Sequence, residues 1–337
     1  MLPTFLMPLV LALAVQTAPE PAAPQESAKR DGHLSIQIGD VEHVLYVPAK
    51  ERLDFKVQVD VALIGKTRVG SFVMTSLVEE YRSGLPRPGE SVEASKKLKG
   101  YIRAQASGGY LGYDLEHLID ARILPQEWPQ VIVHDYQAGT ENRRREVMYG
   151  TRNGKPMSWY RRDRHCQFCE RREHFVQNPF SDEHHCSGCK RGEHRDWDTP
   201  KMQPIPAGGL DMISAIFMAR EMVRAGTERL DFPLIDKDGW WDLTMSLGER
   251  AEIEVPAGKF ACRAVKLDPR TPEGKEDMKD FKGLFGIHGT LSVWLHEATG
   301  VPVKIEGMVP VGPLDLDVEI QLESFEDTPE AFAPIAQ

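Results

Sequence analysis

Apolar and polar residues alternate along much of the chain after residue 33, which predicts a protein built mainly from β-strands. The clearest run keeps a period of two over Leu53, Phe55, Val57, Val59, Val61 and Leu63, the pattern of a strand with one buried face. Similar runs lie at 69–78, 101–111, 131–136 and 145–151, and turns rich in Gly, Pro and Asp separate most of them. Residues 33–160 are therefore expected to form the N-terminal part of a mainly antiparallel sheet.

One helix is expected in the middle of the chain. Asp211 suits the N-cap position, and Gly226 suits the glycine that follows the last turn of a helix. Between them an apolar stripe has helical spacing and consists of Met212, Ile213, Ile216, Phe217, Ala219, Met222 and Val223.

Strands resume after this helix. They are expected at 230–235 and 240–247, on either side of the turn signal Asp238-Gly239, and then at 260–267, 291–295, 302–309 and 314–322. Because sheets of so many strands curl or close, the expected fold is mainly β (α+β). It is a long curved antiparallel sheet, a half-barrel or partly closed barrel, with one central helix. Residues 199–326 complete the same domain, and 327–337 are expected to be a loose tail.

The first residues have the character of an export signal. Residues 1–15 are apolar but shorter than the roughly 20 residues that span a bilayer, and Ala12-Leu13-Ala14 fits a signal-peptidase site with cleavage after Ala14. A buried first helix is the alternative, but Pro3 and Pro8 would interrupt it. Residues 15–32 are rich in Pro and Ala and are expected to be a flexible tether. The mature chain is thus expected to be periplasmic or otherwise exported, without a transmembrane segment.

Charge and motifs exclude several functions. The chain of 337 residues has 41 Lys and Arg against 51 Asp and Glu, a net charge of −10, so no nucleic-acid partner is expected. It contains no GxGxxG, GxxxxGK, GxSxG or HExxH motif. His288, His296 and Glu297 lie near expected strand ends and could form a catalytic cluster, but isolated histidines on turns are usually solvated, and they are interpreted in that way. Cys262, among apolar neighbours, is interpreted as a buried small hydrophobe.

The other four cysteines lie close together and predict a metal site. Two CxxC pairs, Cys166/Cys169 and Cys186/Cys189, are separated by sixteen residues, the spacing of zinc ribbons, and the surrounding pattern H-C-x-x-C-x-R-x-E-H repeats after twenty residues. Residues 161–198 are therefore expected to be an inserted module in which the four thiolates bind one structural zinc. A pair of disulfides and a catalytic or redox metal site are the alternatives.

The helix and the strands after it carry a family resemblance. It rests on the runs 211–220, 255–260, 293–295 and 300–305, with the opening run Glu51-Arg-Leu53-Asp-Phe55 through Gly70. These resemble the exported bacterial family called domain of unknown function 3108, over roughly residues 45–160 and 208–325. The resemblance implies a curved antiparallel sheet wrapped partly around a helix, similar to the half-barrels of periplasmic lipoprotein carriers. It implies no established activity, and the doubled CxxC segment departs from the usual family pattern.

These features together predict an exported, non-enzymatic protein. Its curved sheet is expected to bind a lipid or another apolar ligand, or an envelope protein, on an apolar concave face beside the helix. The candidate groove residues are Met212, Ile216, Phe217 and Met222. A metal-dependent periplasmic enzyme is the alternative from another class, although four thiolates would saturate zinc and leave no position for water. A scaffold whose zinc knuckle docks another protein is a third reading.

Overall fold

The computed structural model describes residues 34–38, 43–61, 65–82, 96–110, 113–123, 131–139, 143–164, 196–236, 239–274, 281, 283, 287–311 and 314–335. The strands are β1 (Leu34–Ile38), β2 (His43–Val47), β3 (Lys50–Val61), β4 (Gly65–Arg82), β5 (Lys96–Tyr110), β6 (Tyr113–Ile123), β7 (Val131–Gly139), β8 (Arg143–Arg152), β9 (Lys155–Arg164), β10 (Asp196–Trp197), β11 (Lys201–Pro204), β12 (Leu210–Asp211), β13 (Arg229–Asp236), β14 (Gly239–Val255), β15 (Gly258–Arg270), β16 (His288–His296), β17 (Pro302–Val311) and β18 (Leu314–Glu326). The helix within these residues, α1, spans Met212–Ala225.

Two chain segments, each folded back and forth, make one long sheet. Strands β3 to β9 pair in sequence order, and so do β13 to β18. The two halves join where β18 pairs antiparallel with β3, so the end of the domain lies beside its beginning. Strands β1 and β2 form a separate two-stranded sheet. The prediction of a long antiparallel sheet is confirmed; among the described pairs, β12 with β13 is parallel.

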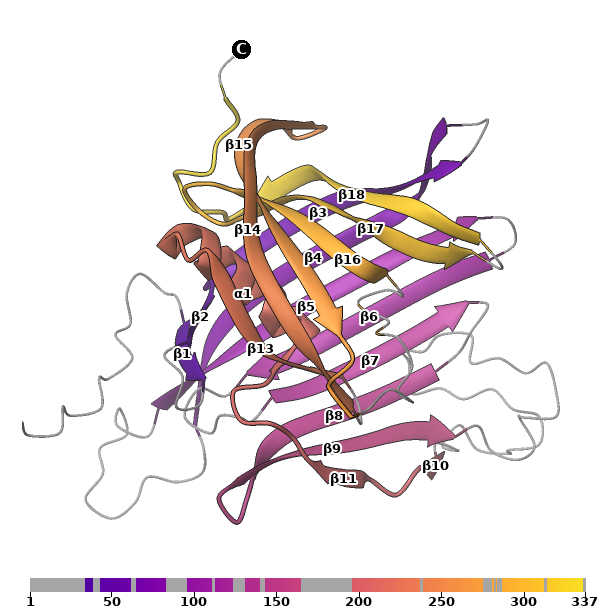
Figure 1. Cartoon of the computed structure of the whole chain (residues 1–337), viewed down its shortest axis with the longest axis vertical. Coiled ribbons are helices and arrows are strands. Elements are labelled where there is room, and N and C mark those ends of the chain that lie inside the picture. Colours follow the sequence, from indigo (N-terminus) through magenta and orange to yellow (C-terminus); the bar gives the residue numbers. More distant parts are fainter. Residues whose placement is uncertain are drawn as a thin grey trace, which may run out of the picture.

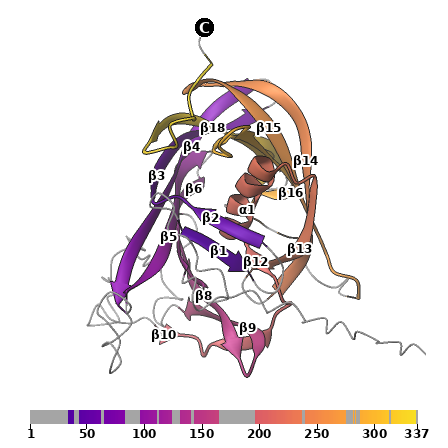
Figure 2. The same ribbon diagram turned by 90° about the vertical axis from the view of Figure 1, so that its left-hand side faces the viewer.

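The sheet curls around α1 without closing. Figure 2 shows the helix between the wall that contains β3–β5 and the wall that contains β13–β15, with β1 and β2 crossing nearby. At one edge β9 pairs with β10 and β11, and at the other edge β13 pairs with β12. Residues 205–209 alone connect β11 to β12, so one short segment of chain links the two edges (Figure 1).

The concave face of the sheet carries the core. Glu51 of β3 faces α1, because its carboxylate pairs with Arg220 of the helix. Side chains alternate along a strand, so Leu53 and Phe55 face the same way, and both are buried. The Phe55 ring stacks on that of Phe72 in β4, with 5.3 Å between centroids. The alternation in the sequence thus marks the face that wraps the helix.

The sequence pattern found most strands but missed two long ones. Strand β6 (YDLEHLIDARI) has His117 on its buried face, and β9 (KPMSWYRRDR) ends in charged residues, so neither shows a clean apolar alternation. Their ladders with neighbouring strands satisfy the backbone instead. Strand β9 also extends to Arg164, so the sheet includes residues 161–164, which the sequence assigned to the inserted module.

Residues 327–335 pack on the sheet, in contrast to the loose tail expected from their composition. Phe332 is buried and stacks on Phe260 of β15, with 4.9 Å between ring centroids. The backbone N–H of Ile335 donates to the carbonyl of Lys259 at 2.7 Å. The Phe332 ring, stacked on Phe260, therefore holds this segment against the sheet. Its Pro and Ala content did not predict such packing.

Candidate functional site

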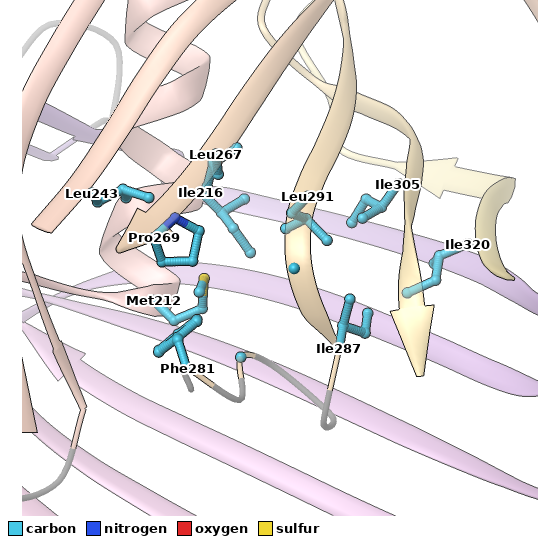
Figure 3. Close-up of a pocket in the computed structure, with 12 residues that line it drawn as sticks. Met212, Ile216, Leu243, Leu267, Pro269, Phe281, Ile287, Leu291, Ile305 and Ile320 are labelled. Atoms are coloured by element: carbon cyan, nitrogen blue, oxygen red, sulfur yellow. The ribbon is translucent and has the colours of Figure 1, made fainter. Parts of the chain in front are cut away.

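An apolar cavity lies between α1 and the inner face of the C-terminal strands (Figure 3). The described residues of its lining include no charged side chain and are Met212, Ile216, Leu243, Leu267, Pro269, Phe281, Gly283, Ile287, Gly289, Leu291, Ile305 and Ile320. The cavity volume is about 20 Å³, and the wider depression, with the solvent at its mouth, measures about 450 Å³. The enclosed part has room for about one water molecule and is too apolar to hold one well.

The structure divides the four predicted groove residues into two pairs. Met212 and Ile216 line the cavity. Phe217 and Met222 do not: both are fully buried in the main core, and the guanidinium of Arg220 lies 5.2 Å from the centre of the Phe217 ring. The helix therefore fills most of the space within the curled sheet, and its first two turns border what remains.

The start of α1 is fixed by the predicted N-cap. Oδ1 of Asp211 accepts hydrogen bonds from the backbone N–H groups of Ile213 and Ser214 at 2.9 and 3.1 Å, and the Ser214 hydroxyl donates to Oδ2 at 2.6 Å. Burial raises the pKa of the Asp211 carboxyl, and the hydrogen bonds oppose this shift. Gly226 ends the helix with φ of 69°. Both predicted caps are confirmed, and they set the position of Met212 at the cavity.

Phe281, which lies beside Met212 in the cavity lining, packs against Trp241 (Figure 3). Their rings are in edge contact, with centroids 5.0 Å apart. Phe281, Gly283 and Ile287 belong to the connection between β15 and β16, and the Gly283 N–H donates to the carbonyl of Ile287 at 2.8 Å. Part of the lining thus lies outside the strands, where side chains can shift without breaking a strand ladder.

A buried polar cluster lies on the inner face of β6, β7 and β8. Nε2 of His117 lies 2.7 Å from Oδ1 of Asp135, and Nε of Arg145 lies 3.4 Å from Oδ2 of the same carboxylate. Gln137, the cross-strand partner of His117, is also buried. Sequence reasoning missed this cluster. The available signal was polar residues at the buried positions of an alternating run.

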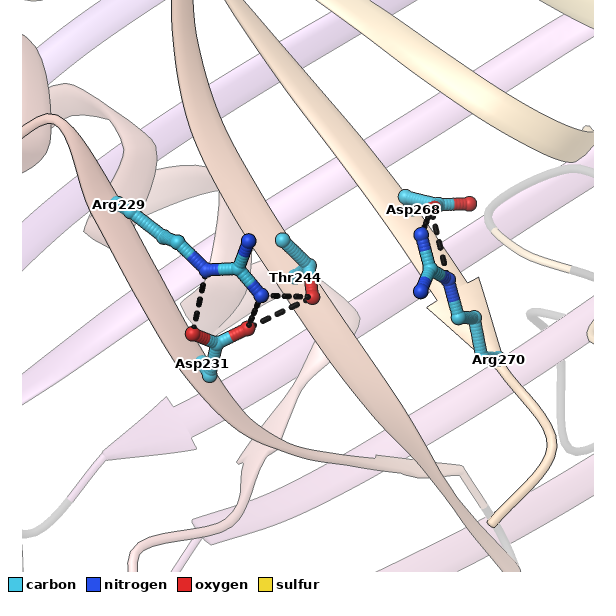
Figure 4. A network of polar contacts seen from close by, with 5 residues as sticks. All are labelled: Arg229, Asp231, Thr244, Asp268 and Arg270. Atoms are coloured by element: carbon cyan, nitrogen blue, oxygen red, sulfur yellow. Dashed lines mark hydrogen bonds and ion pairs between the residues drawn. The ribbon is translucent and has the colours of Figure 1, made fainter. Parts of the chain in front are cut away.

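The outer face of β13–β15 carries exposed ion pairs (Figure 4). The Asp231 carboxylate accepts hydrogen bonds from Nε and Nη2 of Arg229 at 2.7 and 2.8 Å and from the Thr244 hydroxyl at 2.7 Å. These bonds, first those from Arg229, lower the pKa of Asp231 to about 2. Arg270 pairs with Asp268 next to them. These charged side chains pair with one another on the exposed surface. We therefore interpret them as groups that support solubility and strand pairing, and not as a binding site.

Residues 180–319 match a family model. Its description is "Protein of unknown function (DUF3108)". The match includes α1 and β13–β17 and supports the resemblance in this part of the chain. It does not include residues 45–160, where the resemblance stays a prediction.

Two solved structures match the chain at low sequence identity. A β-barrel-like protein of domain of unknown function DUF1849 from Brucella abortus gives a TM-score of 0.46 at 8% identity, covering 83% of this chain and 98% of its own. A candidate exported protein with a YmcC-like fold from Bacteroides fragilis gives a TM-score of 0.28 at 11% identity, covering 87% of this chain and 100% of its own. No curated protein matches the chain.

The predicted zinc ligands Cys166, Cys169, Cys186 and Cys189 lie outside the described residues. Within the described ranges, no three His, Cys, Asp or Glu side chains are grouped as a metal site. The two ends of the cysteine segment do lie side by side, because Asp196 of β10 is the cross-strand partner of Arg164 of β9.

The remaining histidine and cysteine predictions concern the C-terminal strands. Cys262 is buried and burial raises its pKa to about 12, which confirms its interpretation as a small hydrophobe. His296, in contrast, is not solvated as expected: it is buried, with Nδ1 2.9 Å from the Thr299 hydroxyl and its ring against Phe332. In the part of the chain that the structure describes, no helix has the length and apolar character needed to cross a bilayer.

Proposed function

We propose that this chain is an exported, non-enzymatic binding protein that takes an apolar ligand, such as an acyl chain, into the cavity beside α1. The observation that carries the proposal is the lining, which comes from α1, five strands and one connection and, among the described residues, contains no charged side chain. The large exposed hydrophobic side chains of the described surface lie on separate elements and are Leu77, Met202, Met308 and Ile335. The concave cavity is therefore a better candidate than a docking patch on that surface.

Ligand entry requires the lining to move. A cavity of about 20 Å³ accommodates no more than the end of an acyl chain. Phe281 and Ile287 are the side chains whose displacement would extend it toward the wider depression, since they belong to no strand. The ligand's buried methylenes would offset the cost of moving them, at about 0.8 kcal/mol each.

Export is part of the proposal and rests on the sequence. The short apolar run at 1–15 and the small residues before Val15 support removal of a signal peptide after Ala14. N-terminal sequencing of the native protein is expected to begin at or near Val15. An intact Met1 in a cytoplasmic fraction would contradict it.

The binding experiment uses the protein as purified from the periplasm, delipidated and titrated with a fluorescent fatty acid. Leu291→Ala enlarges the cavity and is expected to increase uptake, while Met212→Trp fills it and is expected to reduce uptake. Leu295→Ala is the matched control, because Leu295 is buried on the same strand and does not line the cavity. Equal uptake by all of these proteins, or no uptake by the native protein, would overturn the proposal.

A further inference from the structure

The polar cluster of β6–β8 faces the same interior as the apolar cavity. Leu53 of β3 faces the helix, and directly paired residues on neighbouring strands point to the same side of a sheet. Followed from strand to strand, the cross-strand partners that start from Leu53 are Met74, Ala104, Ile119, Asp135 and Arg145. Ile320, which lines the cavity, is the partner of Val57 and has the same orientation. The cluster on β6–β8 and the cavity beside α1 therefore lie on the same concave face of the curled sheet.

Arg145 is buried with most of its hydrogen-bonding capacity unused. Its side chain is 9% exposed, and the ion pair of Nε with Asp135 at 3.4 Å is the contact that it makes within the described residues. A guanidinium has five N–H donors in a planar fork that fits carboxylates and phosphates. No nitrogen of Arg145 is among the fully enclosed, unpaired side-chain atoms of the described residues, so its Nη groups can be reached from the interior. The Nη1 and Nη2 groups are thus suited to an anionic oxygen that enters the interior.

Asp135 holds this guanidinium in place without using its Nη groups in hydrogen bonds. His117 occupies the other oxygen of the carboxylate at 2.7 Å, so Asp135 is shared between two bases. The carboxylate approaches Arg145 at Nε and leaves the Nη groups on the far side of the guanidinium. A second anion can then pair with the Nη groups through charge-assisted hydrogen bonds.

We propose that Arg145 binds the anionic head of an amphipathic ligand whose apolar part enters the cavity beside α1. This inference rests on the proposed function and narrows the ligand class to molecules with an apolar chain and a carboxylate or phosphate group. Neutral lipids with the same chain bind more weakly.

The test measures displacement of the neutral dye N-phenyl-1-naphthylamine from the full-length protein by dodecanoate, dodecyl phosphate and dodecan-1-ol. At least one anion is expected to bind about tenfold or more tightly than the alcohol, since charge-assisted bonds are strong in a buried site. Arg145→Met is expected to lower the affinity for both anions to that for the alcohol, and to leave the affinity for the alcohol unchanged. The stronger of the two anions identifies the head group as carboxylate or phosphate.

Arg103→Met is the matched control. Arg103 forms a cross-strand pair with Asp120 at 3.3 Å, as Arg145 does with Asp135, but on the exposed outer face. It should change none of the three affinities. If Arg145→Met fails to fold, Arg145→Met/Asp135→Asn also removes the carboxylate charge that Arg145 no longer balances, and the same loss of anion preference is expected.

The outcomes separate this inference from the proposed function. Equal affinities for anions and alcohol, or an anion preference that survives loss of Arg145, would overturn the role of Arg145 and leave apolar binding intact. If neither the dye nor any of the three compounds binds, the proposed function fails, and the inference fails with it.

Discussion

The guanidinium of Arg220 on α1 donates two hydrogen bonds to the carboxylate of Glu51 on β3, with Nη1–Oε2 and Nη2–Oε1 distances of 2.6 and 2.9 Å. Both side chains are 2% exposed, so the pair lies in the core between the helix and the sheet. The two residues are 169 positions apart in the chain. This contact fixes the orientation of the helix within the curled sheet, and with it the position of the cavity.

Breaking this pair should be strongly destabilising. Arg220→Met leaves a buried carboxylate without a partner, and we expect it to lower the free energy of unfolding by about 3–5 kcal/mol. The double variant Arg220→Met/Glu51→Leu should recover much of that loss, because no unpaired charge remains. Denaturant unfolding measures both. Arg52→Met, which breaks the exposed pair with Asp54 on the same strand, is the control and should cost less than about 1 kcal/mol.

Gly300 is expected to be required where the turn before β17 meets the helix. Its φ is 70°, and a Cβ there would lie 2.7 Å from the backbone oxygen of Arg220. Gly300→Ala should therefore cost more than about 2 kcal/mol, from left-handed strain together with the clash. Gly154→Ala is the matched control, since φ is 74° and nothing lies within 4 Å. It should cost about 1 kcal/mol. Equal losses in thermal unfolding would contradict the close packing.

His296 should make stability depend on pH. Burial lowers its pKa below the usual 6.5, against the opposing effect of Glu297. Because the unfolded chain binds a proton more readily than the folded chain, this contribution is present above about pH 6.5 and is lost as pH falls through the folded pKa. Denaturant unfolding between pH 5 and 7.5 should show a shallower slope for His296→Phe than for the native protein. A slope that does not change would exclude His296 as the cause.

The packed C-terminal segment should contribute to stability. Phe332→Ala removes a ring from the cluster with Phe260 and Phe325, and we expect a loss of about 3–5 kcal/mol in the free energy of unfolding. Ile335→Ala, at a side chain that is 37% exposed, should change it by less than about 1 kcal/mol. A Phe332→Ala protein as stable as the native one would mean that the segment is dispensable.

The cysteine segment should bind metal and fold separately from the sheet. We expect about one zinc per chain by elemental analysis, lost in Cys166→Ser/Cys169→Ser, since four thiolates fill the tetrahedral site. Replacing residues 165–195 by a short Gly/Ser linker should leave the main thermal transition close to its original temperature, because β9 and β10 already bring the two ends together. Absence of zinc, with Cys262 as the free thiol, would favour disulfides. Loss of the main transition would make the segment part of the core.

The sequence by itself determined the elements whose signals are local. The caps Asp211 and Gly226 fixed the helix because capping depends on neighbouring backbone groups. Period-two alternation identified most strands, because one face of the sheet is buried throughout. The buried character of Cys262 followed from the same alternation.

Only the tertiary structure decided which of these elements meet. The pairing of β18 with β3 and the Arg220–Glu51 contact join residues far apart in the chain, and no local pattern encodes the partner. Phe217 and Met222 lie on the same apolar stripe of the helix as Met212 and Ile216, but only Met212 and Ile216 border the cavity. The curl of the sheet decides this, because it determines which part of the helix is packed closely by strand side chains. The same curl turns Arg145 inward on a strand whose charged residues otherwise suggest a solvated surface.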